Sequence, residues 1–358
     1  MVQESGDGEK RSQGLSNSGF EWRSPRLLVC SILLVLLLFY YIDYTQFSEK
    51  WATTISLVLT ETFTSQTTNT SLALGRLSTP PGPYYVAYPH KYEFVLNEPE
   101  KCKQENPFVV LIVPVAPGNA AFRDAIRSTW GTEKLVEDKV VSLLFLLGLP
   151  CPKEQENLQE SLLQESEKYH DILQSDFLDS YHNLTIKTMV MLEWLTAYCQ
   201  NASYAMKVDS DVFLNVKRLV NMLLSAPKEN YMTGLVTRGG MVMRDPRSKW
   251  YLPKQVFAPA RYPPYTLGLA YVFSLDLPAK LVEAARHVKA VYIEDVYLGL
   301  CMKHLGISVT NPSEGGLFNV YPVQYNRCRY SKLITTTTRS LRGQIRSWKD
   351  LQTPGSPC

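Results

Sequence analysis

The sequence predicts an α/β domain with a mainly parallel sheet, and three observations support this prediction. Continuous apolar runs rich in β-branched residues occur at 107–117 and 140–148, as expected of strands buried on both faces. A third, largely apolar run at 204–208 is followed directly by acidic residues. Segments with helical spacing separate these runs, and such alternation is typical of α/β sheets, which bind ligands at the carboxyl ends of their strands.

The helices expected between these strands are indicated by spacing and by end signals. Residues 120–131, "AAFRDAIRSTWG", predict a helix that ends near Gly131. Residues 153–173 begin as a solvent-facing helix. Residues 183–199 predict a helix with one apolar face, formed by Leu184, Thr188, Met191, Leu192 and Leu195.

Length and charge limit the class of protein. The chain has 358 residues, of which 45% are hydrophobic, which is enough for one large or two modest domains. The net charge is only +3, and the basic residues form no long tract. A nucleic-acid partner is therefore not expected.

An N-terminal apolar run predicts a membrane anchor. Residues 27–43 carry no charge before Asp43, although this is slightly short of the ~20 residues that span an average bilayer. A signal-peptide core and a buried helix are the alternatives, but the run ends in bulky aromatic residues rather than in a cleavage site. Four cationic residues precede the run and one follows it closely, which predicts a cytoplasmic tail at 1–26 and a type II orientation: Lys10, Arg11, Arg23, Arg26 and Lys50.

The segment after the anchor predicts a stem. Residues 44–91 are rich in Thr and Ser and then in Pro, a composition that buries little core. The lumenal folded domain is expected at 92–358. Six cysteines lie outside the span, and in an oxidising lumen they could form disulfides, with 15 possible full pairings. Free buried thiols are the alternative. A lumenal location also agrees with three glycosylation sequons, at Asn69, Asn183 and Asn201.

Two acidic pairs are candidates for chemistry. Asp209 and Asp211, separated by Ser210, follow the strand at 204–208, where they could share a divalent cation such as Mg²⁺ or Mn²⁺. An Asp-rich turn or a helix cap is the alternative. Glu294 and Asp295 precede a predicted helix, where Asp295 is either an N-cap or a general base for an acceptor hydroxyl.

Two further stretches have residue types suited to a sugar nucleotide. Arg123 and Arg127 are four residues apart, so they share a helix face and could pair with a diphosphate. The alternative is a solvated basic stripe. At 261–274, Gly268 permits close backbone approach, and tyrosines such as Tyr265 could form a platform for a sugar face, or simply pack the loop.

The order of these motifs resembles the β-1,3-glycosyltransferase family of Golgi enzymes. The motifs are "RDAIRSTWG", "KVDSDVF", "YPPY" and "EDVYLG", and two others, "FVLNEPEKC" and "DFLDSYHNLTIKT", favour its β-1,3-galactosyltransferase branch. The resemblance covers residue 92 to the end. It implies a GT-A type nucleotide-sugar-binding sheet with flanking helices, and inverting transfer from a UDP-sugar.

The resemblance also implies roles for single residues. Asp211 is expected to bind Mn²⁺, or another divalent cation, with Asp209 and Ser210 near the metal shell and the donor ribose, and Asp295 is the expected catalytic base. Arg123, Arg127 and Lys207 become candidates for donor binding. Glu294 and Tyr265 are candidates for acceptor binding.

Three positions depart from the family pattern. Thr266 stands where family members often have a cysteine, and Cys151 stands where none is expected, so one disulfide is expected to differ. Thr337 occupies a stretch in which family members usually have a histidine thought to be a second metal ligand. A hydroxyl is a poorer ligand for Mn²⁺ than imidazole. His304 is the candidate substitute for the missing histidine ligand.

The expected function is therefore transfer of galactose from UDP-galactose, in β-1,3 linkage, to N-acetylhexosamine-terminated glycans of proteins or lipids. The expected location is the Golgi membrane, with the catalytic domain in the lumen. The alternatives are a β-1,3-transferase that uses UDP-GlcNAc or UDP-GalNAc, and a non-catalytic lumenal glycan-binding pseudoenzyme. Thr337 motivates the latter.

Overall fold

The computed structural model describes residues 82–152 and 155–358. The predicted tail and anchor and most of the predicted stem lie outside these residues. In the described part of the chain, no helix is both long and apolar enough to cross a membrane. Val86 and Tyr88, at the end of the predicted stem, are buried in the core, so the compact domain begins before residue 92.

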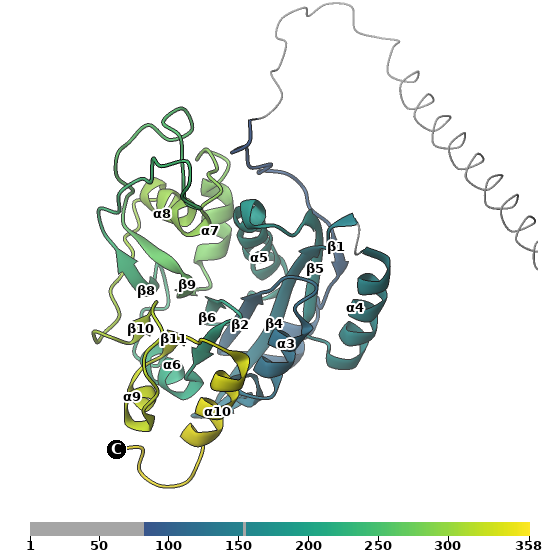
Figure 1. Cartoon of the computed structure of the whole chain (residues 1–358), viewed down its shortest axis with the longest axis vertical. Helices are drawn as coiled ribbons and strands as arrows, with labels where there is room; N and C mark the ends of the chain where they lie inside the picture. The colour runs from purple at the N-terminus through teal and green to yellow at the C-terminus, as the bar shows by residue number, and fades with distance from the viewer. Residues whose placement is uncertain (1–81, 153–154) are drawn as a thin grey trace, which may run out of the picture. The chain divides into compact units, whose positions relative to one another are not determined.

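A central sheet organises the domain (Figure 1), and its inner strands are parallel. β2 (Val109–Pro114) pairs in parallel with β4 (Lys139–Leu149) and β6 (Tyr204–Val208), and β4 pairs in parallel with β5 (Ile172–Leu178). The outer strands run antiparallel: β1 (Phe94–Leu96), β3 (Leu135–Val136), β8 (Met232–Thr237) and β9 (Tyr265–Ser274). The predicted mixed α/β fold is confirmed, with parallel pairing confined to the middle of the sheet.

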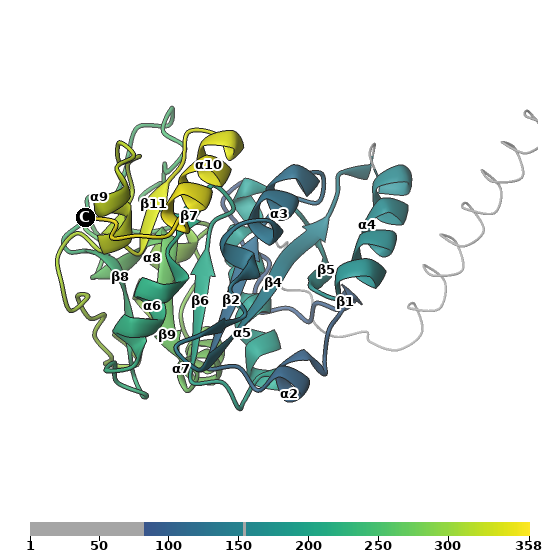
Figure 2. The ribbon, with the colours of Figure 1, turned by 90° about the horizontal axis from the view of Figure 1, so that it is seen from below.

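Helices cover both faces of this sheet, which explains why the inner strands are apolar throughout (Figure 2). On one face, Val110 and Ile112 of β2 pack in a core with α5 (Leu184–Tyr198), α7 (Leu277–Ala284) and α8 (Glu294–His304). On the other face, Val109 and Leu111 pack in a core with α3 (Ala120–Arg127), α4 (Gln155–Tyr169) and α6 (Val216–Leu223). This alternation is the two-residue period of a strand.

The remaining elements are short or lie near the C-terminus. A second sheet consists of β7 (Val212–Leu214), β11 (Thr335–Thr337) and β10 (Phe318–Asn319), in which β11 pairs antiparallel with β7. The other helices are α2 (Lys101–Glu105), α9 (Arg327–Lys332) and α10 (Leu341–Leu351).

Helix α5 is buried on all sides, which differs from the single apolar face expected from the sequence. Residues 185–192, Trp194 and Leu195 are all buried. The reason is that α5 packs between the sheet on one side and helices α7 and α8 on the other. Its buried polar residues therefore need partners, which they find at the cavity described below.

Four of the six predicted lumenal cysteines form disulfides. These are Cys102–Cys199, which links α2 to the end of α5, and Cys328–Cys358, which ties the C-terminus to α9. Cys151 is free and exposed, whereas Cys301 is free and buried in α8. Burial raises the pKa of the Cys301 thiol to about 12, so this cysteine remains a neutral core side chain.

Candidate active site

A cavity of about 760 Å³ lies at the carboxyl ends of the parallel strands. Its walls include Pro114–Ala116 after β2, Asp179–Tyr181 after β5, and Asp209 with Ser210 after β6. The start of α8 and the middle of β9 close another side. Both the location and the volume are typical of ligand-binding sites in α/β sheets.

The first acidic pair lies in the tight connection between β6 and β7. Asp209 accepts a backbone hydrogen bond from Val212 and donates its own N–H to the Leu269 carbonyl at 2.9 Å. Asp209 and Ser210 line the cavity, whereas Asp211 is exposed beside it and its carbonyl accepts two hydrogen bonds from Thr338. Burial and the nearby charge of Asp209 raise the pKa of Asp211. Two carboxylates that repel each other in this way suit a shared cation.

Asp209 and Asp211 could hold a divalent cation whose other ligands are water and substrate phosphates. In the described part of the chain, no group of three or more His, Cys, Asp or Glu side chains is arranged to hold a metal. Mg²⁺-like ions are often held by one or two carboxylates together with water and substrate phosphates. Asp209 and Asp211 would be the protein ligands of such an ion.

Lys207 connects the two acidic pairs. Its ammonium group donates to Asp209 Oδ1 at 2.6 Å, to Glu294 Oε1 at 3.2 Å, and to the Gly268 carbonyl. The side chain is buried, and although burial opposes its charge, Asp209 and Glu294 raise the pKa of Lys207. All three N–H donors are used within the protein. The geometry therefore gives Lys207 a supporting position beneath the cavity, where it holds both acidic segments together.

Asp295 lies in the first turn of α8 and faces the cavity. The N-cap position belongs to Ile293, so the N-cap alternative for Asp295 does not apply. Its carboxylate accepts hydrogen bonds from the backbone N–H groups of Gly268 at 2.9 Å and of Val296 at 2.8 Å. Burial raises the pKa of Asp295, and these two hydrogen bonds oppose the rise. A raised pKa makes a carboxylate a stronger base, provided that it is ionised.

Gly268 permits this arrangement because it has no side chain. A Cβ at this position would lie 2.6 Å from Glu294 Oε1 and 3.3 Å from Asp295 Oδ2. The close approach of β9 to α8 is what brings the Gly268 N–H to Asp295 and the Gly268 carbonyl to Lys207. The close backbone contact that was expected of this glycine is therefore made with other parts of the protein itself.

Glu294 lines the cavity, but protein donors already occupy its carboxylate. Besides Lys207, it accepts hydrogen bonds from Thr188 at 3.3 Å and from Tyr271 at 3.2 Å. Burial raises the pKa of Glu294 to about 7, against the opposing charge of Lys207. This geometry favours a supporting role over the acceptor-binding role expected from the resemblance.

Aromatic side chains form the opposite wall. Tyr265 lines the cavity with Tyr262, whose ring centre is 6.1 Å away, and with Tyr181, Tyr292 and Trp250. The Lys249 ammonium lies 4.6 Å from the centre of the Trp250 ring. The long connection between β8 and β9 supplies Trp250 and Tyr262. Tyr262 and Tyr265 belong to the stretch 261–274 in which the sequence indicated a platform of tyrosines, whereas Trp250, Tyr181 and Tyr292 were not indicated.

A buried ion pair between Lys187 and Asp179 was also missed by the sequence analysis. Lys187 donates to Asp179 Oδ2 at 2.6 Å and to the Val115 carbonyl at 3.0 Å, and both side chains line the cavity. Burial lowers the pKa of Lys187. The sequence did contain a signal for this ion pair: Asp179 and Lys187 lie within "DFLDSYHNLTIKT", one on each side of a predicted helix start.

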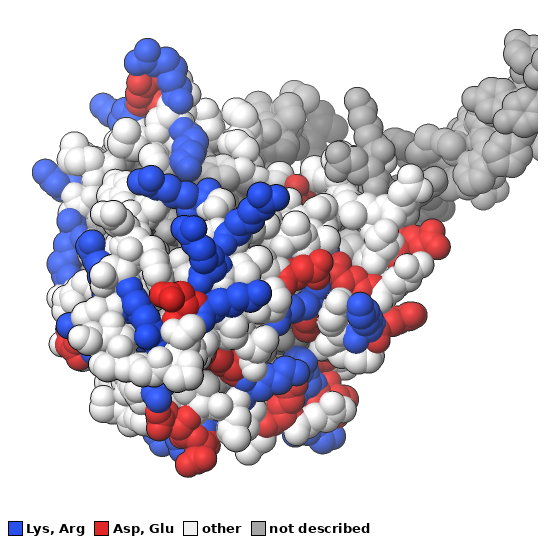
Figure 3. All heavy atoms as spheres, turned by 60° about the horizontal axis from the view of Figure 1, so that its bottom comes forward, with Lys and Arg blue, Asp and Glu red and all other residues white. Residues whose placement is uncertain are grey.

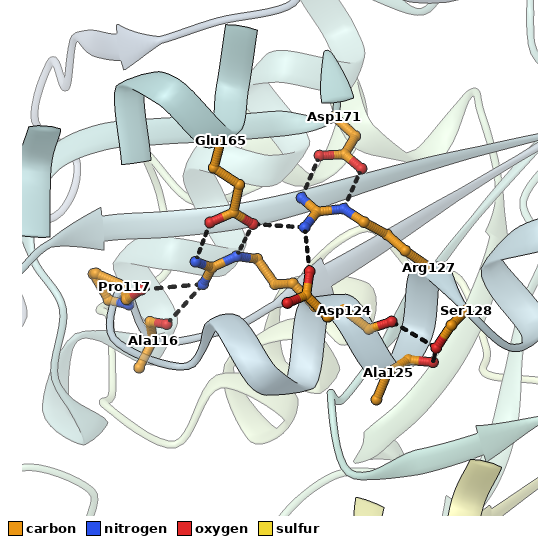
Figure 4. A network of polar contacts seen from close by, with 9 residues as sticks. Ala116, Pro117, Asp124, Ala125, Arg127, Ser128, Glu165 and Asp171 are labelled. Carbon is orange, nitrogen blue, oxygen red and sulfur yellow. Dashed lines mark hydrogen bonds and ion pairs between the residues drawn. The ribbon is translucent and has the colours of Figure 1, made fainter. Parts of the chain in front are cut away.

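Arg123 and Arg127 are not among the residues that line the cavity, and carboxylates from other elements hold both of them. Figure 4 shows Arg127 in contact with Glu165 and Asp171. Arg123 forms a two-point pair with Glu165 at 2.7 and 2.6 Å and also donates to the carbonyls of Ala116 and Pro117. Arg127 forms a two-point pair with Asp171 at 2.8 and 2.7 Å and also contacts Glu165. Burial opposes the charge of Arg127, but these carboxylates raise its pKa. Both arginines therefore support the cavity wall, rather than meeting a diphosphate as expected.

The remaining predicted positions are distributed around the domain. Thr337 lies in β11 opposite Val212, and its hydroxyl donates to the carbonyl of the cavity residue Val320 at 2.8 Å. His304 is at the far end of α8 from Asp295 and stacks on His287 at 5.6 Å, so it does not replace a ligand at the cavity. Asn183 is half-buried and Asn201 is exposed, whereas Asn69 lies outside the described residues.

Basic side chains gather on the face seen in Figure 3, although the sequence shows no basic tract. On α10, Arg342, Arg346 and Lys349 are exposed on one side of the helix, and none of them forms an ion pair with another described residue. Their spacing of four and three residues places them on one helix face.

Comparisons with known proteins identify the family. Residues 121–313 match the family model described as Galactosyltransferase. The chain is 41% identical over 272 residues to Beta-1,3-galactosyltransferase 2 of Pongo abelii, a match that covers 75% of this chain and 64% of that protein. It is 39% identical over 266 residues to Beta-1,3-galactosyltransferase 1 of Mus musculus, covering 74% of this chain and 79% of that protein.

A comparison with solved structures gives a weaker match. The apo structure of the WbbM bifunctional glycosyltransferase is 13% identical with a TM-score of 0.38, and the match covers 65% of this chain and 46% of that one. A match of this size does not establish a shared fold, so the GT-A assignment stays a prediction. The sequence matches, in contrast, confirm the predicted family: this chain belongs to the galactosyltransferase family and is related to its β-1,3-galactosyltransferases.

Proposed function

We propose that this chain is an inverting hexosyltransferase that transfers galactose from UDP-galactose, in β-1,3 linkage, to N-acetylhexosamine-terminated glycans of glycoproteins or glycolipids. The observation that carries the proposal is that Asp209 and Asp295 line one cavity, and that Lys207 and Gly268 join them through hydrogen bonds. The family membership and the names of the related galactosyltransferases support the choice of sugar and linkage.

In this mechanism, Asp295 accepts the proton of the acceptor hydroxyl as its oxygen attacks the anomeric carbon of galactose. The bond from that carbon to UDP breaks on the opposite face, so an α-linked donor gives a β-linked product. A divalent cation held by Asp209 and Asp211 would supply positive charge for the UDP leaving group. The Gly268 and Val296 N–H groups hold the Asp295 carboxylate in position.

The proposal includes the location and the partners expected from the sequence. The chain would be anchored in the Golgi membrane through residues 27–43, with the catalytic domain in the lumen and with glycans at Asn69, Asn183 and Asn201. The donor is a UDP-sugar, the acceptor is a glycan on a protein or a lipid, and the cation is Mn²⁺.

A donor screen tests this proposal. The purified full-length chain is incubated with UDP-galactose, UDP-GlcNAc or UDP-GalNAc and with β-linked GlcNAc and GalNAc glycosides, with and without Mn²⁺. We expect turnover with UDP-galactose that depends on Mn²⁺, and a β-1,3 linkage in the product by NMR. Preference for another donor would change the assigned sugar. UDP-galactose binding without turnover on any acceptor would favour the pseudoenzyme.

A further inference from the structure

Tyr262 has a buried hydroxyl group without a hydrogen-bond partner among the described residues. The side chain is only 7% exposed, yet it lines the cavity that contains Asp295. Buried hydroxyl groups in folded proteins nearly always find a partner, because burial without one is costly. Tyr262 also lines the cavity, so a molecule bound there can become the partner once the hydroxyl, which has almost no accessible surface in the free protein, turns toward it.

The position of the Tyr262 ring is set by its neighbours. Its centre is 5.4 Å from that of Phe257 and 6.1 Å from that of Tyr265, and its backbone N–H donates to the Gly240 carbonyl at 2.9 Å. Burial raises the pKa of Tyr262 to about 12, and the charge of Asp295 contributes to the rise. The hydroxyl is therefore a neutral donor at physiological pH, and Tyr262 belongs to the same cavity lining as Asp295.

We infer that the Tyr262 hydroxyl donates a hydrogen bond to an oxygen atom of the acceptor sugar, either a ring hydroxyl or an acetamido carbonyl. The acceptor is favoured over the donor sugar because Tyr262 packs against Tyr265 of β9, the strand whose Gly268 N–H positions Asp295, and Asp295 is the group that meets the attacking acceptor hydroxyl. This inference rests on the proposed function. It makes Tyr262 a specificity-determining residue, since a sugar without that oxygen leaves the buried hydroxyl unpaired.

Tyr292 provides a matched control in the same cavity. It is similarly buried, with 3% exposure, but its hydroxyl donates to the carbonyls of Lys249 at 3.0 Å and of Tyr251 at 2.8 Å. Replacing either tyrosine by phenylalanine removes one oxygen atom and keeps the ring. Only Tyr292→Phe breaks hydrogen bonds within the protein, so the two variants separate substrate recognition from structural support.

The experiment measures the melting temperature and steady-state kinetics of the full-length chain and of the variants Tyr262→Phe and Tyr292→Phe. We expect Tyr292→Phe to lower the melting temperature, and Tyr262→Phe to leave it unchanged or to raise it. We expect Tyr262→Phe to raise the KM for the acceptor about tenfold, with the KM for UDP-galactose within about twofold of wild type. An unchanged acceptor KM, or a rise in the donor KM alone, would overturn the inference.

A set of deoxy and N-deacetylated acceptors locates the recognised oxygen. The analogue that lacks it should bind wild type about tenfold more weakly and should bind Tyr262→Phe no more weakly than the parent acceptor does. If every analogue weakens both proteins equally, Tyr262 contacts no acceptor oxygen. If wild type shows no turnover with any donor, the proposed transfer reaction fails. The same analogue series, measured by calorimetric binding, then still decides whether Tyr262 contacts the sugar.

Discussion

In the described part of the chain, two clusters of largely buried charged side chains differ in their charge balance, one around Lys207 at the cavity and one around Arg123 and Arg127 beside α4. In the arginine cluster, two guanidinium groups face the carboxylates of Glu165 and Asp171, and each arginine has a two-point pair. In the Lys207 cluster, one ammonium group faces Asp209 and Glu294, with Asp295 held nearby through Gly268. The buried groups of the first cluster are balanced in charge, with only the exposed Asp124 in addition, whereas the second cluster has excess negative charge.

This difference distinguishes a supporting network from a site for chemistry. Balanced, two-point ion pairs satisfy their own hydrogen bonds and have no need of a ligand. Carboxylates in excess of their cations raise one another's pKa and remain able to take a proton or a metal ion. The cluster with excess negative charge lines the cavity, and the balanced one does not.

The largest effect is expected when a carboxylate becomes an amide in each cluster. Asp295→Asn removes the proposed base and should lower kcat about 10²–10⁴-fold, because the acceptor hydroxyl then loses its proton acceptor. Glu165→Gln makes the same chemical change in the arginine cluster and should leave kcat within about threefold. Steady-state kinetics with UDP-galactose measure both effects. A kcat for Asp295→Asn within tenfold of wild type would remove Asp295 from its role.

A second comparison removes a cation from each cluster. Lys207→Met leaves the buried Glu294 without a cation and should lower the free energy of unfolding by about 3–5 kcal/mol, whereas Arg123→Met leaves Glu165 still paired with Arg127 and should cost less. Urea unfolding of the full-length chain measures this loss. Only Lys207→Met should also change Mn²⁺ binding, because Lys207 contacts Asp209 directly. Equal Mn²⁺ affinities in the two variants, measured by EPR, would show that Lys207 has no influence on the cation site.

The charge difference also predicts a pH dependence. Burial raises the pKa of Asp295, and the proposed base must be ionised, so kcat/KM should fall as the pH drops through a value above the usual range for aspartate. Lys207→Met removes a positive charge that lowers the pKa of Asp295 and should move this acidic limb to higher pH. Glu165→Gln, in the balanced cluster, should not move it. Profiles of kcat/KM against pH for the three proteins test this order, and coincident profiles would contradict it.

The sequence predicted the inner part of the fold well, because the inner strands and their helices have local signals. The apolar runs at 107–117 and 140–148 became β2 and β4, and the acidic residues after β6 lie at the carboxyl edge of the sheet as expected. Spacing also placed Arg123 and Arg127 on one face of α3. It could not show that Glu165 and Asp171, some 40 residues further along the chain, would face them.

The same limit explains which parts of the site were missed. The Lys207 cluster brings together β6, β9 and α8, and its contacts depend on how closely β9 approaches α8 at Gly268. In the aromatic wall, Trp250 comes from the irregular connection between β8 and β9, which has no periodic pattern to interpret, and Tyr181 and Tyr292 come from other segments. Local sequence patterns indicate which residue types are present, but the partner of a buried charge depends on tertiary packing.

The smallest effect is expected from restoring a histidine at Thr337, next to the cluster with excess negative charge. Thr337 pairs with Val212, one residue after Asp211, and its hydroxyl contacts the cavity residue Val320. An imidazole at this position can add a ligand, so Thr337→His should tighten Mn²⁺ binding about fivefold, a gain of about 1 kcal/mol. Thr337→Leu is the control, because it changes the same position without adding a ligand atom. Calorimetric Mn²⁺ titrations that rank Thr337→His no tighter than Thr337→Leu or wild type would show that the excess charge at Asp209 and Asp211 does not extend to β11.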